Sequence, residues 1–365
     1  MKIGIVGAGQ LARMLALAGY PLGLRCTVLD PAPDACAGQV AELLQGAYDD
    51  REKLTRLAEQ VDLVTFDFEN VPAATAGFLA ERVPVFPPPT ALETAQDRLS
   101  EKRLFLHLGI PTPAFQAIDS LDELRAAVAE IGLPAVLKTR RMGYDGKGQY
   151  VLRAEQDIDQ AWETAQGSPL ILEAFVPFES EVSILAVRDR QGRKAFYSLV
   201  QNHHRNGILR LSTAPCVAAD LAKQAQDYAT RILDRLEYVG VLAVEFFERD
   251  DQLLANEMAP RVHNSGHWTI EGAETSQFEN HLRAILGLPL GSTAALGYTA
   301  MLNCIGDLAD QTTVLAIPGA HFHAYGKTPQ PGRKVGHITL RAADPLTLSR
   351  LLTPLLPAEL VDVLE

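Results

Sequence analysis

The first ninety residues alternate short apolar runs with one segment of helical periodicity. An apolar run this short, bounded by glycine or proline, is typical of a buried strand. After the first run, Gly7 to Ala12 open a helix that is predicted to extend to about Gly19. Strands are predicted at 2–6, 26–29 and 63–66, and a fourth run, 83–86, leads into three prolines at 87–89. Because proline stiffens the backbone, one α/β unit is expected to end near residue 90.

The middle of the chain mixes helices and strands. A polar helix is predicted over 92–108, where Gly109-Ile110-Pro111 stops it. Ser120 and Glu123 form a capping box before a second helix that Gly132 and Pro134 end. A long amphipathic helix is predicted over 219–236. Strands are predicted at 135–138, 149–152, 170–172, 240–247 and 253–257, the last two as a pair joined by a turn at Asp250-Asp251.

Length, charge and cysteine content narrow the class of protein. A chain of 365 residues suggests two or three domains, and the part after about Thr299 is predicted to be β-rich, with a turn-rich stretch at 326–336 before a strand at 337–340. The net charge of −12 argues against a nucleic-acid or membrane-surface partner. The four cysteines form no C-x-x-C pair, so neither zinc nor disulfides are indicated. With no cationic leader and no apolar run near 18 residues, we expect an unexported, cytoplasmic protein.

The densest polar chemistry lies in Asn256 to Trp268, which follows the short apolar run 253–255. Its polar groups should therefore emerge at a strand end, where α/β enzymes place their chemistry. Glu257 beside Asn256 could hold a divalent metal, and Arg261, His263 and Asn264 could bind a small planar anion. The alternative is a solvated loop.

Glycines at two places predict phosphate contacts. Gly7-x-Gly9-x-x-Ala12, followed by Asp30, matches a dinucleotide-binding fingerprint, although the same turn could bind another phosphate or no ligand at all. Lys138 ends a strand, and the loop 142–149 carries three glycines and Lys147. Such a loop can close over phosphates, but its spacing is not that of a Walker loop, and a plain hairpin turn is the alternative.

Further charged residues could complete a nucleotide site. Glu173 at a strand end could accept hydrogen bonds from ribose hydroxyls, and Glu181 lies a few residues later, although either could be an ordinary surface charge. Glu245 lies inside an apolar strand, where it needs a cation, either Mg²⁺ shared with Glu257 or a buried arginine. The turn 330–337 carries two cations and is either a solvated hairpin tip or a second anion site.

These motifs together resemble the N5-carboxyaminoimidazole ribonucleotide synthetase family of ATP-grasp enzymes in purine biosynthesis. The resemblance runs almost end to end, through 7–11, Asp97-Arg98, 143–149, 181–183, 256–269 and 331–337. It implies an α/β fold with a Rossmann-like domain (1–90), a two-lobed ATP-grasp module (91–298, mobile lobe about 112–176) and a small β-rich C-terminal domain (299–365). A homodimer is also implied.

The resemblance implies roles for individual residues. Arg261, His263, Asn264 and Asp145 would be catalytic, with the first three holding bicarbonate, and Glu245 and Glu257 would hold Mg²⁺. The ribonucleotide would contact Gly9, Gln10, Leu11, Glu69, Tyr144, Asp145, Lys327, Arg333 and Lys334. ATP would contact Arg98, Lys138, Gly143, Tyr144, Asp145, Gly146, Lys147, Gly148, Gln149, Glu173, Ala174, Phe175, Val176, Glu181, His204, Asn256 and Glu257. Lys147 stands where many relatives have arginine, and His203 beside His204 is a second candidate for the histidine that contacts ATP.

The implied reaction joins ATP, bicarbonate and 5-aminoimidazole ribonucleotide, through carboxyphosphate, into N5-carboxyaminoimidazole ribonucleotide, ADP and phosphate. Three alternatives remain open. Another acyl-phosphate ATP-grasp ligase, such as formate-dependent glycinamide ribonucleotide transformylase, shares Gly146-Lys147-Gly148-Gln149 and the Pro260-Arg261-x-His263 element. An NAD oxidoreductase could use the first glycine turn with Asp30. A nucleotide-binding regulator would bind ATP without turnover.

Overall fold

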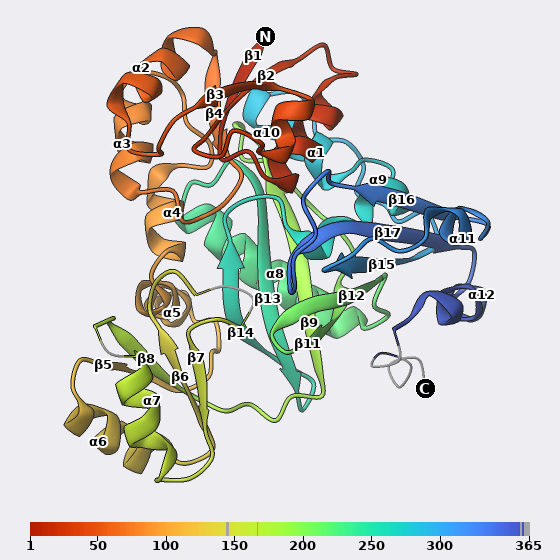
Figure 1. Cartoon of the computed structure of the whole chain (residues 1–365). Helices are drawn as coiled ribbons and strands as arrows, with labels where there is room; N and C mark the ends of the chain where they lie inside the picture. The colour runs from red at the N-terminus through yellow and green to blue at the C-terminus, as the bar shows by residue number, and fades with distance from the viewer. Residues whose placement is uncertain (144–145, 166, 358–359, 361–365) are drawn as a thin grey trace.

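The N-terminal domain is a four-stranded parallel sheet with helices packed around it (Figure 1). The computed structural model describes residues 1–143, 146–165, 167–357 and 360. The sheet has the order β3-β2-β1-β4, and the three strands predicted before residue 70 are confirmed. The elements are β1 (Lys2–Val6), α1 (Gln10–Gly19), β2 (Arg25–Asp30), η1 (Cys36–Gln39), β3 (Glu42–Gln45), α2 (Arg51–Gln60), β4 (Leu63–Phe66) and α3 (Ala73–Ala80).

In this part of the chain the single helix predicted over 92–108 is wrong, and the apolar run 83–86 does not form a full strand. The run 83–86 makes only an isolated bridge between Val64 and Val85, because the flanking prolines have no backbone N–H to extend a strand ladder. The helix predicted over 92–108 is two helices, α4 (Pro89–Ala95) and α5 (Arg98–His107). Asp97 separates them, because its carboxylate accepts hydrogen bonds from the backbone N–H groups of Leu99 and Ser100 and so begins a new helix.

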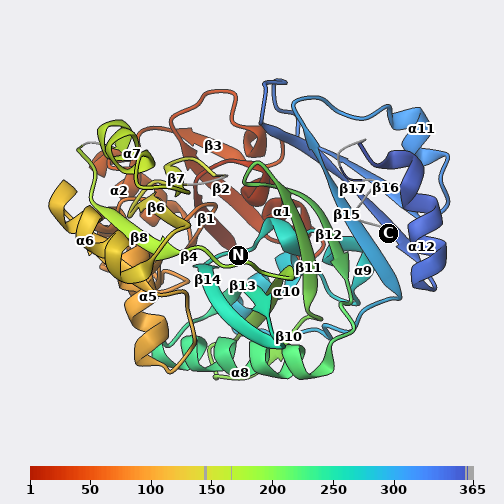
Figure 2. The same ribbon diagram turned by 90° about the horizontal axis from the view of Figure 1, so that it is seen from below.

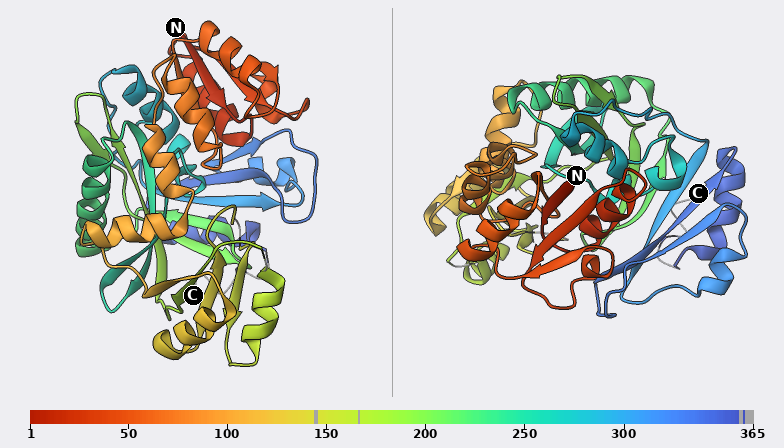
Figure 3. Two further views of the ribbon diagram at one scale, coloured as in Figure 1. Left: turned by 90° about the vertical axis from the view of Figure 1, so that its left-hand side faces the viewer. Right: turned by 90° about the horizontal axis from the view of Figure 1, so that it is seen from above.

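A small lobe follows α5 and projects from the rest of the molecule (Figure 3, left). Its sheet has the order β5-β8-β6-β7, and all its pairs are antiparallel. Ser120 caps α6 as predicted, by accepting from the Glu123 N–H at 3.2 Å. The elements are β5 (Phe115–Ile118), α6 (Leu121–Ile131), β6 (Ala135–Thr139), β7 (Gln149–Leu152), α7 (Asp157–Ala165) and β8 (Leu170–Ala174).

The largest sheet has nine strands, in the order β14-β13-β9-β11-β12-β15-β17-β16 with β10 paired to β9 (Figure 2). Alternate residues of β9 face opposite cores: Val182 and Ile184 pack with α8, whereas Leu185 and Val187 pack with α10 and α1. The elements are β9 (Ser180–Arg188), β10 (Lys194–Phe196), β11 (Val200–Arg205), β12 (Ile208–Ala214), α8 (Ala219–Arg235), β13 (Gly240–Arg249), β14 (Gln252–Ala259), η2 (Asn264–Gly266), α9 (Thr269–Gly272) and α10 (Gln277–Leu286).

The C-terminal part adds strands to this same sheet instead of forming a separate one. β15 pairs with β12, and β17 lies between β15 and β16. The boundary at residue 299 therefore stays a prediction, as do those at 90 and 298. The elements are β15 (Tyr298–Ile305), α11 (Gln311–Leu315), β16 (Ala320–Ala324), β17 (Lys334–Ala342), α12 (Pro345–Leu352) and η3 (Thr353–Leu355). Across the described residues, the helices are too short or too polar to cross a membrane.

Candidate active site

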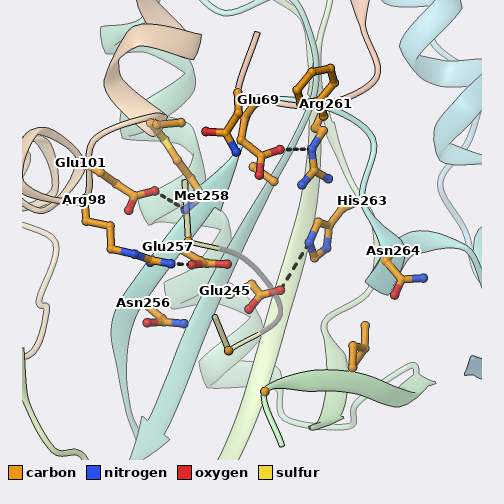
Figure 4. A pocket seen from close by; sticks show the side chains of 18 of the residues that line it. Glu69, Arg98, Glu101, Glu245, Asn256, Glu257, Met258, Arg261, His263 and Asn264 are labelled. Carbon is orange, nitrogen blue, oxygen red and sulfur yellow. Dashed lines mark hydrogen bonds and ion pairs between the residues drawn. The ribbon is translucent and has the colours of Figure 1, made fainter. Parts of the chain in front are cut away.

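A cavity of about 590 Å³ is lined by residues of the nine-stranded sheet, of the small lobe, and of α1 and the segment after β4 in the N-terminal domain. Its wall includes most of the residues predicted from the sequence, and Figure 4 shows ten of the lining side chains by name. The predicted residues in the wall are Gln10, Leu11, Glu69, Arg98, Lys138, Gly143, Gly146, Gln149, Glu181, His204, Glu245, Asn256, Glu257, Arg261, His263, Asn264 and Lys334.

Other predicted residues lie outside this wall or outside the described part of the chain. Tyr144 and Asp145 are not among the described residues, so the roles predicted for them stay predictions. Within the described ranges, the wall does not include Gly9, Lys147, Gly148, Glu173, Ala174, Phe175, Val176, Lys327 or Arg333.

Two carboxylates face each other at the centre of the cavity. Glu245 of β13 and Glu257 of β14 are register partners, because the register shifts by one residue between Glu245 and Phe246. Burial and the charge of Glu257 raise the pKa of Glu245 to about 7. Burial also opposes ionisation of Glu257, but Arg98, whose Nη1 lies 2.8 Å from Oε2, outweighs it and brings that pKa down to about 2. The arginine expected as a possible partner of Glu245 therefore pairs with Glu257.

The donor set at this pair fits a magnesium ion. The side-chain oxygen Oδ1 of Asn256, next to Glu257, is buried without a hydrogen-bond partner. Two carboxylates and an amide oxygen are hard ligands, and Mg²⁺ in nucleotide sites takes its remaining ligands from phosphates and water. In keeping with this, nowhere in the described part of the chain do three His, Cys, Asp or Glu side chains form a complete metal cage.

Arg261 and His263 lie beside the carboxylate pair (Figure 4). The Arg261 Nε donates to Glu69, and the Nε2 of His263 is 3.5 Å from Glu245 Oε1. The Nδ1 of His263 accepts the backbone N–H of Ser265 at 3.3 Å, which places the ring proton on Nε2. Burial and the charge of Arg261 lower the pKa of His263 to about 3, so the ring is neutral. Neutral His263 and charged Arg261 are both hydrogen-bond donors toward the cavity.

Asn264 is oriented by the C-terminal part of the sheet. Its Nδ2 donates to Asn303 Oδ1 at 3.1 Å, and Asn303 Nδ2 donates back at 2.7 Å. Asn303 comes from β15 and was not predicted as a site residue. The amide pair holds Asn264 in the cavity wall beside His263.

At the end of the cavity predicted to bind the nucleotide, Lys138 forms an ion pair with a buried glutamate. Its Nζ lies 2.9 Å from Glu173 Oε2, and Lys102 Nζ lies 3.3 Å from the same oxygen. Burial opposes the charge of Glu173, but the two lysines lower its pKa to about 2. Because Glu173 is only 2% exposed and already paired, its carboxylate does not face the cavity as the ribose hypothesis required.

The glycine-rich loop packs closely against its surroundings. Gly148 has φ +72°, and a Cβ there would meet Thr139 Oγ1 at 2.4 Å. A Cβ on Gly146, which also has positive φ, would meet Gly207 Cα at 3.1 Å. These glycines let the loop lie against β6 and the β11–β12 turn, with Gly143 and Gly146 in the cavity wall.

His204 is the histidine of its pair that faces the main cavity. Its Nδ1 is 2.8 Å from Glu181 Oε2. Burial disfavours the charged ring, but the bond to Glu181 and the charge of Glu245 outweigh burial, so the pKa of His204 is raised. His203 lies with His204 on the rim of a neighbouring smaller hollow but not in the main wall.

The first glycine turn is partly filled by the chain itself. Asp67, at the end of β4, accepts the N–H groups of Gly9 at 2.8 Å and Ala12 at 2.6 Å. A Cβ on Gly9 would meet Asp67 Oδ2 at 2.6 Å. The glycine is therefore needed to accommodate Asp67, and the phosphate contact expected at Gly9 stays a prediction.

Asp30 is also occupied. Its carboxylate accepts from the N–H of Ala8 at 3.0 Å and from the Tyr48 hydroxyl at 2.8 Å. A dinucleotide ribose would need these same oxygens, and its pyrophosphate would need the helix end that Asp67 covers. This packing disfavours the NAD alternative.

The cations predicted for the ribonucleotide reach this turn to different extents. Lys327 Nζ donates to Gln10 Oε1, and Lys334 lines the cavity. Arg333 instead donates to the carbonyl of Thr328 at 3.1 Å, outside the wall.

Several cavity residues escaped the sequence prediction. Asp67, Gln96 and Arg140 come from strand ends or loops without a motif, and Met258 is an apolar residue inside the polar stretch 256–268. Glu101 lies in a helix that looks like an ordinary polar surface helix. The nearby Asp97-Arg98 pair was the available indication of chemistry there.

Comparison with known families agrees with this geometry. Residues 1–96 match the ribonucleotide synthetase preATP-grasp domain, residues 103–278 the ATP-grasp domain, and residues 299–350 the phosphoribosylaminoimidazole carboxylase C-terminal domain. The fold and the site thus define an ATP-grasp protein. The N5-carboxyaminoimidazole ribonucleotide synthase of Pseudomonas aeruginosa is 59% identical over 95% of this chain and 96% of its own. The chain belongs to the N5-carboxyaminoimidazole ribonucleotide synthase family.

Solved structures give the same result. The N5-carboxyaminoimidazole ribonucleotide synthetase of Thermus thermophilus is 57% identical, with a TM-score of 0.93 over 97% of each chain. The N5-carboxyaminoimidazole synthase of Aspergillus clavatus, in complex with ADP and 5-aminoimidazole ribonucleotide, is 32% identical, with a TM-score of 0.91 over 99% of this chain and 98% of its own. The family resemblance and the ATP-grasp fold predicted from the sequence are confirmed.

Proposed function

We propose that this protein carboxylates 5-aminoimidazole ribonucleotide to N5-carboxyaminoimidazole ribonucleotide, with hydrolysis of ATP, in purine biosynthesis. The observation that carries the proposal is the 59% identity to a synthase over nearly the whole of both chains. The cavity supports it, because paired carboxylates, a neutral histidine and an arginine converge there.

The chain's own residues suit a reaction through carboxyphosphate. Bicarbonate is a weak nucleophile, so its orientation by Arg261, His263 and Asn264 would supply much of the rate. One bicarbonate oxygen would attack the γ-phosphorus and ADP would leave. The carboxyl carbon of carboxyphosphate would then pass to the 5-amino nitrogen, which loses a proton as phosphate departs. Arg261 would absorb charge in the first step.

We propose that Glu245, Glu257 and Asn256 hold Mg²⁺. When bound, the ion would neutralise the charge that develops on the β- and γ-phosphates. Two observations support this. The two carboxylates are register partners, and Asn256, whose side-chain oxygen has no hydrogen-bond partner among the described residues, lines the cavity.

We assign ATP to the side of the cavity near the small lobe, and the ribonucleotide to the side near α1. Lys138 on β6, the loop 143–149 and His204 on β11 would contact ATP, and the support is that Lys138, Gly143, Gly146, Gln149 and His204 line the same cavity as the paired carboxylates. Gln10 with Lys327 would contact the ribonucleotide, and two N–H groups, of Gln10 and Leu11, lie in the first turn of α1 beside those that Asp67 engages.

A substrate panel tests the function. ADP formation should require both bicarbonate and 5-aminoimidazole ribonucleotide. Formation that requires formate and glycinamide ribonucleotide would instead identify the transformylase alternative, and an absorbance change in the nicotinamide band would identify an oxidoreductase. ATP binding without turnover on either substrate pair would identify a regulator.

We also propose that the protein is a homodimer that acts in the cytoplasm. The dimer is supported by family membership, and the compartment by four cysteines that are all free thiols. Sedimentation velocity would test the dimer, and a monomer at micromolar concentration would contradict it.

A further inference from the structure

Helix α5 buries a face that is charged instead of apolar. Arg98, Glu101 and Lys102 stand at spacings i, i+3 and i+4, so they share one side of the helix. Their exposed fractions are 8%, 2% and 0%. Burying such groups is costly unless each finds a partner, so the partners of this face indicate what the helix is for.

The partners lie on β14, which is the edge strand of the nine-stranded sheet. An edge strand has backbone groups that no neighbouring strand can pair. Glu101 Oε1 accepts the backbone N–H of Met258 at 2.6 Å, and Lys102 Nζ donates to the carbonyl oxygen of Ala255 at 3.1 Å. Helix α5 thus supplies side-chain partners for two of these groups, and the segment after it bonds the same edge: the Ala255 N–H donates to the Pro111 carbonyl at 2.7 Å, and Thr112 Oγ1 donates to the Ala255 carbonyl at 3.0 Å.

These two contacts bracket the residues predicted to hold the metal. Between Ala255 and Met258 lie Asn256 and Glu257, where the register of β14 on β13 shifts by one residue. Such a bulge re-aims side chains and interrupts the ladder that would otherwise hold them. Figure 4 shows Glu101 bonded at Met258 beside the Arg98–Glu257 pair.

Lys102 extends the same contacts into the small lobe. Its Nζ is also 3.3 Å from Glu173 Oε2 on β8, and that oxygen lies 2.9 Å from Lys138 Nζ on β6. One buried series of contacts therefore connects Ala255, next to the carboxylate pair, with Lys138 at the nucleotide end.

We propose that Glu101 and Lys102 are positioning residues that hold the Asn256–Glu257 bulge in place and set its distance from Lys138. The inference rests on the proposed function, because it takes the bulge to bind the metal–nucleotide complex. Neither residue needs to touch a substrate. Their effect passes through the backbone of β14 and through Glu173.

The first test uses the protein without metal or nucleotide. Hydrogen exchange of the peptide spanning 254–259 should be about tenfold faster in Glu101→Ala, because the Met258 N–H loses its acceptor. Glu101→Gln keeps an acceptor oxygen and should stay near the wild type. Glu93→Ala, an exposed change on neighbouring α4, is the matched control and should leave this peptide unchanged.

The second test uses the metal. In Glu101→Ala, the Mg²⁺ concentration for half-maximal turnover should rise and kcat should fall, each by about tenfold, with the KM for ATP changed much less. Glu101→Gln should restore both. Lys102→Met should weaken the binding of both Mg²⁺ and ATP, because it removes the contact with the Ala255 carbonyl and the contact with Glu173. The exposed Lys223→Met on α8 is its control.

Unchanged exchange and unchanged Mg²⁺ dependence in Glu101→Ala would overturn the proposal, as would equal damage in Glu101→Gln. If Glu101→Ala does not fold, Lys102→Met decides by the same two readouts. A wild type that turns over no aminoimidazole ribonucleotide would count against the proposed function instead, and the exchange test would still stand.

Discussion

Glu245 and Glu257 stand directly opposite each other on β13 and β14, yet their pKa values differ widely, at about 7 and about 2. Arg98 Nη1 lies 2.8 Å from Glu257 Oε2, whereas Glu245 Oε1 lies 3.5 Å from the Nε2 of the neutral His263 ring. One carboxylate is thus held ionised while the other shares a proton near neutral pH. A divalent cation would allow both to ionise.

Replacing Glu257 with glutamine should reduce turnover by at least about a hundredfold, because an amide offers a hard cation one oxygen and no charge. The Mg²⁺ requirement should rise as well. The control is Asp251→Asn at the exposed tip of the same hairpin, where asparagine tolerates the positive φ of 57°. Normal turnover and Mg²⁺ dependence in Glu257→Gln would remove the metal assignment.

His263→Ala and Arg261→Ala should each lose carboxylation by about a hundredfold while ATP binds with near-normal affinity. Both side chains lie beside the carboxylate pair, on the segment that follows β14. Equilibrium ATP binding, measured beside bicarbonate-dependent ADP formation, checks the separation. His321→Ala, an exposed change on β16, serves as control. A collapse of ATP binding without a distinct bicarbonate defect would contradict the assignment.

Cation substitutions should separate the two anion sites. Lys138→Met and Lys147→Met should each weaken ATP binding, by a few kcal/mol at most. Arg333→Ala should raise the KM for the ribonucleotide and leave ATP binding unchanged. Lys138→Met should also lower stability, because Glu173 keeps only Lys102. Arg56→Ala, an exposed change on α2, is the control. If Arg333→Ala raised only the KM for ATP, the division would be wrong.

Gly9→Ala should destabilise the fold by about 1–3 kcal/mol, because its Cβ would press on Asp67. It should also raise the KM for the ribonucleotide, because Asp67 shapes the turn beside Gln10. Gly77→Ala is the matched control: it lies in α3 with no atom within 4 Å of the new Cβ, and should stabilise by about 0.5–1 kcal/mol. Urea unfolding measures both. Equal effects at the two positions would show that Asp67 exerts no steric constraint.

Stability should fall with acid through His281. Its Nδ1 accepts the Val241 N–H, so its Nε2 donates to Thr65 Oγ1, and burial lowers its pKa to about 4. Above pH 6.5 neither state binds a proton; between 6.5 and 4 the unfolded state alone does, so stability is lost as pH falls.

Between pH 7 and pH 5, protonation of His281 in the unfolded state should lower the free energy of unfolding by about 2 kcal/mol. In His281→Gln, the difference in free energy of unfolding between the two pH values should shrink by that amount. The exposed His321→Gln should leave it unchanged. An unaltered pH dependence in His281→Gln would exclude His281 as its source.

The sequence alone determined the chemistry and the local geometry of the site. The β13–β14 hairpin follows from period-2 patterning and a two-residue turn, where Asp250 and Asp251 both adopt positive φ. Local periodicity predicted the hairpin, but its regular register would place Asn256 opposite Glu245; the bulge at Asn256 brings Glu257 there instead. The roles of the remaining site residues were predicted from the family resemblance, because a motif can be recognised without deriving the fold.

Only the tertiary structure decided which charges meet. Asp67 fills the helix end at Gly9 from 58 residues away, and Arg98 reaches Glu257 from 159 residues away. The polar spacing that predicted one surface helix over 92–108 contains the buried face of α5. Contacts between residues far apart in the sequence produce no periodic pattern. A charged residue is the same in the sequence whether its side chain is solvated or paired with a buried opposite charge. Burial and pairing are properties of the folded chain, and here they set which carboxylate is ionised.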